Sequence, residues 1–303
     1  MANWQTVSIG IFSRLMLKPL TKREVSVARL RAQTRAMEWL YPRRPPGFEL
    51  TRERVSPTCT IDHFRQSGSL TDRVILHFPG GAYITRMPRA EGRMLARICR
   101  AANAEGYLVR YRLAPEHPFP AGQIDCIAAY GKLMADGVPP DRIILSGISA
   151  GGGMALSVLF ALRDQGLPLP AGLVAMSPFT DLTNPGEGSR LENRSRDDVL
   201  GRTPRHALLR IYADGDEEIL RHPYVSPVLG DYRGLPPMLF QVGCKEILLD
   251  DTRRCADRAR QAGVDAQVEE WPDVPHAWQA MSVLPESRRA VDRIGDFIRE
   301  RCP

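Results

Sequence analysis

The most informative segment of the sequence is Arg142-Ile-Ile-Leu-Ser-Gly-Ile-Ser-Ala-Gly-Gly-Gly-Met154, near the middle of the chain. Its first residues have the apolar, β-branched composition of a buried strand. The turn Gly147-Ile-Ser-Ala-Gly151 follows, and an apolar helix begins directly after it. A turn this tight needs small residues beside Ser149, and it lifts the serine hydroxyl above the sheet at a helix N-terminus. Backbone N–H groups and the helix dipole there favour developing negative charge, so we predict that Ser149 is a nucleophile. The alternative is a glycine-rich turn with a chance serine.

Strand-like and helical segments alternate on both sides of this stretch. Such alternation requires crossover connections, and it predicts an α/β fold with a mostly parallel central sheet covered by helices on both faces. Residues 50–62 are expected to add an antiparallel edge. The expected strands are 74–78, 107–111, 142–146, 172–176, 238–242 and 266–271, and the expected helices are 90–104, 123–135, 150–164, 251–262 and 286–301.

Two segments fall outside this alternation. Residues 22–41 carry apolar side chains near helical spacing and stop at prolines, and we expect two helices before the core. Residues 184–237 contain charged helical stretches and prolines without a strand pattern, and they are too long for a simple loop. Both segments are expected to form a helical cap over the carboxyl ends of the strands, where open α/β sheets bind ligands. The predicted division is core at 46–183 and 229–303, with the cap at 1–45 and 184–228.

The composition is ordinary for a globular protein. The chain has 303 residues, of which 43% are hydrophobic and 25% charged. No apolar run approaches the roughly 20 residues that cross a bilayer, and the start of the chain lacks a signal-peptide pattern. The six cysteines are spread singly, without the spacing of a metal site or a disulfide framework. We therefore expect a cytoplasmic protein with no metal, no cofactor and no stable membrane insertion.

The net charge of +6 is concentrated at the N-terminus, because residues 1–54 hold eleven Arg or Lys against four Asp or Glu. Nucleic-acid binding would favour aromatic residues among the basic ones or a recognised motif, and neither is present. We expect no nucleic-acid partner. A solvated helical face, or weak attraction to anionic membrane surfaces, explains the charge better.

A serine hydroxyl needs a base to take its proton. His276 follows the strand expected at 266–271, in the turn segment Asp273-Val-Pro-His-Ala-Trp278, at the carboxyl edge of the sheet. The other five histidines lie within a strand, among prolines or in polar surroundings. We predict that His276 is the base for Ser149.

The base in turn needs a carboxylate that fixes its tautomer and stabilises the imidazolium. The chain order of serine, carboxylate and histidine places this group between Ser149 and His276. Glu246 lies closest to the end of the strand expected at 238–242, whereas Asp250 and Asp251 are explained as charges at a helix start. We predict Glu246 as the acid, with Asp250 as the alternative.

An oxyanion hole requires backbone donors on a loop beside the nucleophile. The strand at 74–78 runs into Pro79-Gly-Gly-Ala-Tyr83, where glycines allow the chain to approach a substrate closely. We predict that the N–H groups of Gly80 and Gly81 form this hole, together with that of Ala150, the residue after the serine.

Together these residues resemble the hormone-sensitive-lipase group of bacterial esterases within the α/β-hydrolases. The resemblance covers residues from about 25 to 300. Counted from Gly-Leu-Pro-Pro at 234–237, the resemblance also places the catalytic carboxylate on Glu246. The similar stretches are 78–83, 111–121, 147–153, 177–182, 234–237 and 275–278.

The resemblance implies a helical cap, a homodimer and a carboxylesterase that acts on a small ester with a short or medium acyl chain through an acyl-enzyme. Hydrolysis of a lactone or an amide by the same triad is an alternative. A non-catalytic small-molecule receptor on the same scaffold is another. This chain departs from the family at Pro79, where a histidine is usual, at Ile148, where Asp or Thr is usual, and at Ala82, which replaces a third glycine.

Overall fold

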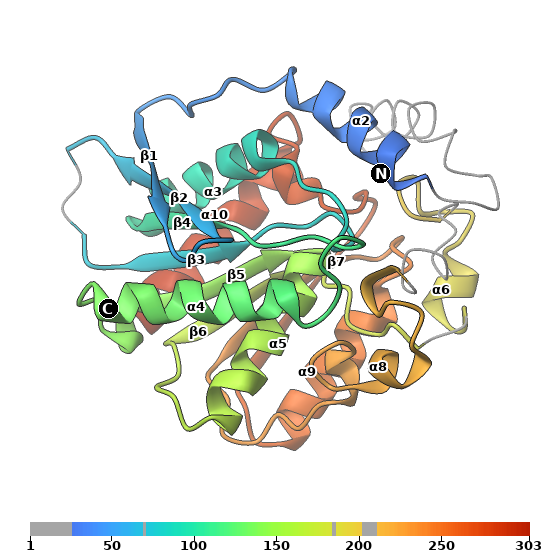
Figure 1. The fold of residues 1–303 in the computed structure, drawn as a ribbon. Coiled ribbons are helices and arrows are strands. Elements are labelled where there is room, and N and C mark those ends of the chain that lie inside the picture. Colours follow the sequence, from blue (N-terminus) through green and yellow to red (C-terminus); the bar gives the residue numbers. More distant parts are fainter. Residues whose placement is uncertain (1–25, 69–70, 184–185, 202–210) are drawn as a thin grey trace.

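An eight-stranded sheet runs through the part of the protein that the computed structural model describes, which is residues 26–68, 71–183, 186–201 and 211–303 (Figure 1). The strand order is β1-β2-β4-β3-β5-β6-β7-β8. The strands are β1 (Phe48–Arg54), β2 (Thr60–Gln66), β3 (Val74–Phe78), β4 (Glu105–Arg110), β5 (Ile143–Ile148), β6 (Gly172–Met176), β7 (Met238–Gly243) and β8 (Ala266–Trp271). Strands β3 to β8 are parallel, which confirms the mostly parallel sheet.

The antiparallel edge expected over 50–62 is present and larger than expected. It consists of two strands, β1 and β2, which pair with each other in antiparallel register from Phe48 opposite Gln66 to Arg54 opposite Thr60. Strand β2 also pairs antiparallel with β4, so this hairpin joins the parallel strands directly.

Helices cover both faces of the sheet. The described helices are α2 (Val27–Glu38), α3 (Pro88–Ala102), α4 (Ala121–Ala135), α5 (Ala150–Asp164), α6 (Ser189–Glu192), α8 (Glu217–Arg221), α9 (Leu249–Gln261) and α10 (Pro285–Arg301), with short 3-10 turns η2 (Pro140–Arg142), η3 (Pro227–Leu229) and η4 (Trp278–Ala280). Of these, α3 and α10 pack on one face of the sheet, and α4, α5 and α9 pack on the other. The long helices lie where the alternation placed them, and two of them, α3 and α10, begin with a proline, which is favoured at the first helical position.

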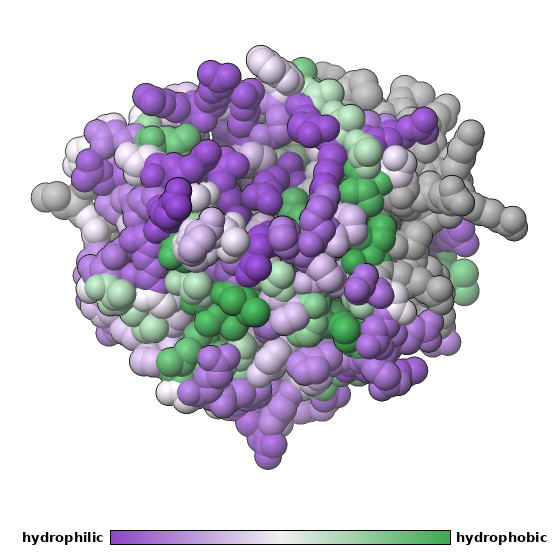
Figure 2. Space-filling model, viewed as in Figure 1, coloured by the Kyte–Doolittle hydropathy of each residue, from purple (hydrophilic) through white to green (hydrophobic). Residues whose placement is uncertain are grey.

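Two hydrophobic cores lie on opposite faces of the sheet. Because side chains alternate along a strand, Ile143 and Leu145 of β5 enter one core and Ile144 enters the other. Burial on both faces explains why the central strands are continuous apolar runs. On the face that Figure 2 shows, hydrophilic residues cover most of the surface and hydrophobic residues form separate small groups.

The N-terminal segment and the insertion both reach the carboxyl edge of the sheet. Arg31 of α2 donates hydrogen bonds to the carbonyl oxygens of Ile84 and Ala114, which follow β3 and β4. Helices α6 and α8 belong to the insertion, and its described residues contain no strand. Of the two helices expected before the core, α2 is described, and the other falls on residues 1–25, outside the described part. The division of the chain into core and cap stays a prediction.

No helix in the described ranges is both long and apolar enough to cross a membrane. The cytoplasmic location and the homodimer stay predictions.

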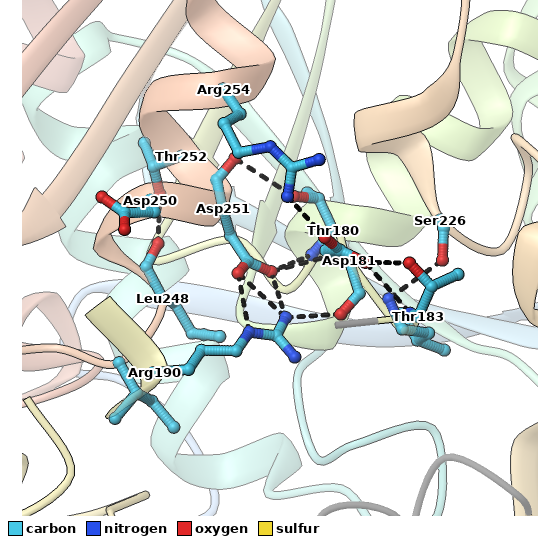
Figure 3. A network of polar contacts seen from close by, with 12 residues as sticks. Thr180, Asp181, Thr183, Arg190, Ser226, Leu248, Asp250, Asp251, Thr252 and Arg254 are labelled. Carbon is cyan, nitrogen blue, oxygen red and sulfur yellow. Dashed lines mark hydrogen bonds and ion pairs between the residues drawn. The ribbon is translucent and has the colours of Figure 1, made fainter. Parts of the chain in front are cut away.

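A buried ion pair fastens the insertion to the core (Figure 3). The guanidinium of Arg190 in α6 contacts the carboxylate of Asp251 in α9 through Nε at 3.0 Å and Nη2 at 2.6 Å, and both side chains are 1% exposed. The same carboxylate accepts hydrogen bonds from the backbone N–H groups of Thr180 at 3.1 Å and Asp181 at 2.9 Å. Asp251, expected as a helix-start charge, therefore also joins α6, α9 and the loop after β6.

Replacement of Arg190 by leucine should lower the free energy of unfolding by about 3–5 kcal/mol, because it leaves the buried Asp251 carboxylate without this counterion. Urea denaturation measures the change. The control is Arg253→Leu, which breaks an exposed ion pair with Glu270 and should cost less than about 1 kcal/mol, because water screens that pair. Equal losses in the two variants would contradict the anchoring role of Arg190.

Candidate active site

Ser149 lies in a tight turn between β5 and α5. Its φ of 56° and ψ of −123° are strained for a residue with a side chain. A Cβ atom added to Gly147 would lie 2.0 Å from the carbonyl oxygen of Gly151, and one added to Gly151 would lie 1.9 Å from that of Phe78. Only glycine fits at these two positions. Because β5 ends at Ile148 and α5 begins at Ala150, the predicted strand, turn and helix around the serine are confirmed.

Ser149, His276 and Glu246 form one chain of hydrogen bonds. The Oγ atom of Ser149 lies 3.0 Å from Nε2 of His276, and Nδ1 of His276 lies 2.5 Å from Oε2 of Glu246. These residues follow the parallel strands β5, β8 and β7, which end at the same edge of the sheet. The structure therefore brings together the three side chains that the sequence singled out.

The carboxylate and the imidazole of this chain are buried. Glu246 is 1% exposed, and its Oε1 accepts hydrogen bonds from the Ser177 hydroxyl and the Gly243 N–H, each at 2.7 Å. Burial raises the pKa of the Glu246 carboxyl, and the contact with His276 opposes this. Burial by itself lowers the pKa of His276, but the negative charges of Glu246 and Asp197 outweigh it and hold that pKa above its ordinary value of 6.5. His276 is therefore a stronger base than an isolated histidine.

The insertion supplies two groups that support Glu246 and that sequence reasoning missed. The side-chain amide of Asn193 donates to the carbonyl oxygens of Cys244 at 3.0 Å and Glu246 at 2.9 Å. The Asp197 carboxylate accepts the N–H of Ile247 at 3.0 Å. Both residues lie in the charged segment that the sequence pattern assigned only to a cap, and nothing in that pattern distinguishes them. Ser177 was also missed, although it begins one of the stretches that carry the resemblance.

Asp250, the alternative acid, makes other contacts. Its Oδ2 accepts the N–H of Ser189 at 2.7 Å, and its Oδ1 lies 3.6 Å from Arg253. Within the described residues Asp250 makes no hydrogen bond with His276, whereas Glu246 does.

In the loop after β3, one of the predicted donors of the oxyanion hole is already engaged in a hydrogen bond. The N–H of Gly80 donates to Oε2 of Glu91 at 3.0 Å, so it is not free to bind an oxyanion, and the prediction for Gly80 is wrong for this reason. In the parts of the chain that the structure describes, the N–H groups of Gly81, Ala82 and Ala150 have no acceptor. Gly81 and Ala150 therefore remain candidate donors, and Ala82, which was not among the predicted donors, joins them.

Gly81 is required by its surroundings. Its φ is 110°, and an added Cβ would lie 2.2 Å from the carbonyl oxygen of Thr85.

Among the described side chains, no group of three or more His, Cys, Asp or Glu residues is placed to hold a metal ion.

Similar proteins now identify the chain. The model of a family described as alpha/beta hydrolase fold matches residues 75–280. An acetyl-hydrolase from Streptomyces hygroscopicus is 39% identical over 256 residues, which are 84% of this chain and 83% of that protein. Esterase LipU from Mycobacterium tuberculosis is 34% identical over 271 residues, which are 84% of this chain and 89% of that protein.

Solved structures agree. The crystal structure of an esterase from the bacterial hormone-sensitive lipase (HSL) family has a TM-score of 0.91 and 36% identity, and the match covers 100% of both chains. The crystal structure of EstE5 soaked by p-nitrophenyl butyrate has a TM-score of 0.90 and 34% identity over 99% of each chain. The chain therefore belongs to the alpha/beta hydrolase fold family, in its group of bacterial hormone-sensitive-lipase-like esterases.

Proposed function

We propose that this protein hydrolyses carboxylic esters with short or medium acyl chains through an acyl-enzyme, with Ser149, His276 and Glu246 as its catalytic triad. The observation that carries the proposal is the continuous chain of hydrogen bonds from the Ser149 hydroxyl through His276 to Glu246. It contains a nucleophile, a base and an orienting carboxylate in contact with one another.

In the first half of the reaction, the Oγ atom of Ser149 attacks the ester carbonyl while Nε2 of His276 accepts its proton. Glu246 accepts the hydrogen bond of Nδ1 and stabilises the imidazolium that forms. The tetrahedral intermediate then collapses, the bond to the leaving alcohol breaks, and His276 returns the proton to that alcohol. Ser149 now carries the acyl group.

In the second half, a water molecule attacks the acyl group while His276 accepts a proton from the water. Collapse of the second tetrahedral intermediate releases the carboxylic acid, and the proton returns to Ser149. In both halves the negative oxygen binds the N–H groups of Gly81, Ala82 and Ala150. Ala150 begins α5, so the dipole of this helix adds to the stabilisation.

Contacts of the insertion support the limit on acyl length. Tyr83, at the end of the glycine loop, stacks on Tyr212 of the insertion with ring centroids 3.9 Å apart, and Phe119 meets Tyr212 edge-on at 6.0 Å. Arg31 of α2 holds the neighbouring carbonyl oxygens of Ile84 and Ala114. Aromatic side chains and α2 therefore lie close around the glycine loop. A related acetyl-hydrolase and a related esterase soaked by p-nitrophenyl butyrate also suggest short acyl chains.

Hydrolysis of nitrophenyl esters from acetate to palmitate tests the proposal. We expect the highest turnover with short or medium chains, and Ser149→Ala should lower kcat by roughly 10⁴-fold or more. A fluorophosphonate should label the unmodified protein stoichiometrically and leave the variant unlabelled. Ser157→Ala, which removes another serine hydroxyl from α5, should keep full turnover. Unchanged turnover in Ser149→Ala would refute the mechanism, and activity that rises steadily to the longest chain would refute the acyl limit.

Glu246→Gln should lower kcat by roughly 10⁴-fold with little change in KM, because the carboxylate acts mainly when His276 becomes positively charged. Asp250→Asn should keep kcat and lower the free energy of unfolding by about 0.3–1 kcal/mol, as expected for a charge at a helix start. Steady-state kinetics and thermal unfolding measure both variants. The reverse pattern would assign the acid to Asp250.

The pH dependence of kcat/KM should show an acidic limb with a midpoint above 6.5. Only neutral His276 accepts a proton, and its raised pKa means that the base is lost as the pH falls through that value. Asp197→Asn removes one negative charge that raises this pKa, so the limb should move to lower pH. Asp250→Asn is the control and should leave the limb in place. A limb that moves to higher pH in Asp197→Asn would contradict this assignment.

A further inference from the structure

A cluster of buried polar residues lies beside the glycine loop and takes no part in the triad. Glu91 is 7% exposed, His77 is 0% exposed and Ser146 is 1% exposed. Oε2 of Glu91 accepts the N–H of Gly80 at 3.0 Å and lies 3.4 Å from Nε2 of His77. Nδ1 of His77 lies 3.1 Å from the hydroxyl oxygen of Ser146.

One histidine tautomer satisfies every group in this cluster. With its proton on Nε2, His77 donates to Glu91, and its Nδ1 accepts the hydrogen bond of the Ser146 hydroxyl. The hydrogen bonds then run without a break from Gly80 in the loop to Ser146 in β5, three residues before Ser149. Glu91 and His77 therefore connect the glycine loop to β5, the strand that precedes Ser149.

The backbone of the glycine loop needs such an external contact. Ala82 and Tyr83 have φ values of 54° and 63°, which cost free energy in residues that carry a side chain. Strained conformations of this kind persist only where the surroundings hold them. The loop begins with Pro79, which has no N–H. The carbonyl oxygen of Pro79 accepts a hydrogen bond from the Tyr111 hydroxyl at 2.8 Å. The first N–H group of the loop is that of Gly80, and Glu91 holds it.

The position of this loop relative to Ser149 leaves little tolerance. A Cβ added to Gly80 would lie 2.9 Å from the carbonyl oxygen of Ile148 and 3.4 Å from Cβ of Ser149. A small shift of Gly80 therefore changes where the next two N–H groups, of Gly81 and Ala82, lie relative to the serine. Catalytic donors must be positioned within a fraction of an ångström to act on a developing oxyanion.

We propose that Glu91 is a positioning residue of the oxyanion hole: its carboxylate holds the N–H of Gly80 and so aims those of Gly81 and Ala82 at the carbonyl oxygen of the ester. Glu91 acts through the loop and does not touch the substrate. The inference rests on the proposed esterase function. It also accounts for how this chain holds the loop with Pro79 at the position where a histidine is usual in the group.

The test compares Glu91→Leu, which removes the acceptor, with Glu91→Gln, which keeps an acceptor oxygen of the same reach. Glu91→Leu should lower kcat by about 10–100-fold, which does not exceed the effect of losing a whole oxyanion donor, and should change KM by less than about 3-fold. Its affinity for a trifluoromethyl ketone, which adds to Ser149 as a tetrahedral oxyanion, should fall by the same factor as kcat. Glu91→Gln should retain kcat within about 3-fold of the unmodified protein.

Glu38→Leu is the matched control. Glu38 is also a buried carboxylate that accepts backbone N–H groups, those of Arg89 and Ala90, at the start of the same helix, α3. It has no hydrogen bond to the glycine loop in the described structure, so its replacement should lower the unfolding temperature and leave both kcat and the ketone affinity unchanged. If Glu91→Leu fails to fold, Glu91→Asp replaces it. The aspartate side chain is one methylene shorter, so its carboxylate lies farther from the Gly80 N–H, and kcat should fall as it does in Glu91→Leu.

The outcomes separate this inference from the proposed function. A folded Glu91→Leu variant with unchanged kcat and ketone affinity, in a protein that does hydrolyse esters, would overturn the role of Glu91 alone. A Glu91→Gln variant that loses as much as Glu91→Leu would also overturn it, because the acceptor oxygen would then not matter. Absence of ester hydrolysis in the unmodified protein would instead refute the proposed function.

Discussion

The close approach of backbone atoms around Ser149 constrains everything else in the site. Glycine is required at 147 and 151 because an added Cβ would lie 2.0 Å or less from a carbonyl oxygen, and Ser149 itself has a φ of 56°. The surroundings hold this strained turn in place, because it lies between the fully buried strand β5 and the largely buried helix α5. It fixes the hydroxyl at the carboxyl edge of the sheet, and every partner of the serine has to reach that point.

The partners reach it because parallel strands end together, and the insertion adds contacts to the backbone around one of them, Glu246. Asn193 and Asp197 hold the backbone around Glu246, and Asp197 adds negative charge near His276. The buried pair of Arg190 and Asp251 fastens the same segment to α9 and to the loop after β6. The insertion therefore supports the backbone that carries Glu246, the proposed acid, and its role as a cap stays a prediction.

The glycine loop shows how a single hydrogen bond changes an assignment. Gly80 and Gly81 are adjacent and equally suitable by sequence, yet the N–H of Gly80 is taken by Glu91 while that of Gly81 has no acceptor in the described structure. Ala82 shows the opposite case. It replaces the third glycine that is usual in the group, yet its backbone N–H has no acceptor in the described structure and is available as a donor. Donor identity in such a loop depends on which way each peptide faces, and this is set by contacts from another helix.

Features whose physical requirements lie in adjacent residues could be predicted from the amino-acid sequence alone. The strand, turn and helix around Ser149 follow from apolar periodicity and from glycines that a tight turn needs, and His276 and Glu246 follow from their places just after expected strands. The supporting contacts, in contrast, depend on how distant segments pack together in the folded protein. Asp197 meets Ile247 across 50 residues of sequence, and Asn193 meets Glu246 across 53, so no local pattern records them. Even Glu91 and Gly80, 11 residues apart, meet only because α3 packs against the loop, and a hydrogen bond between separate elements exists only once packing has brought its donor and acceptor within reach.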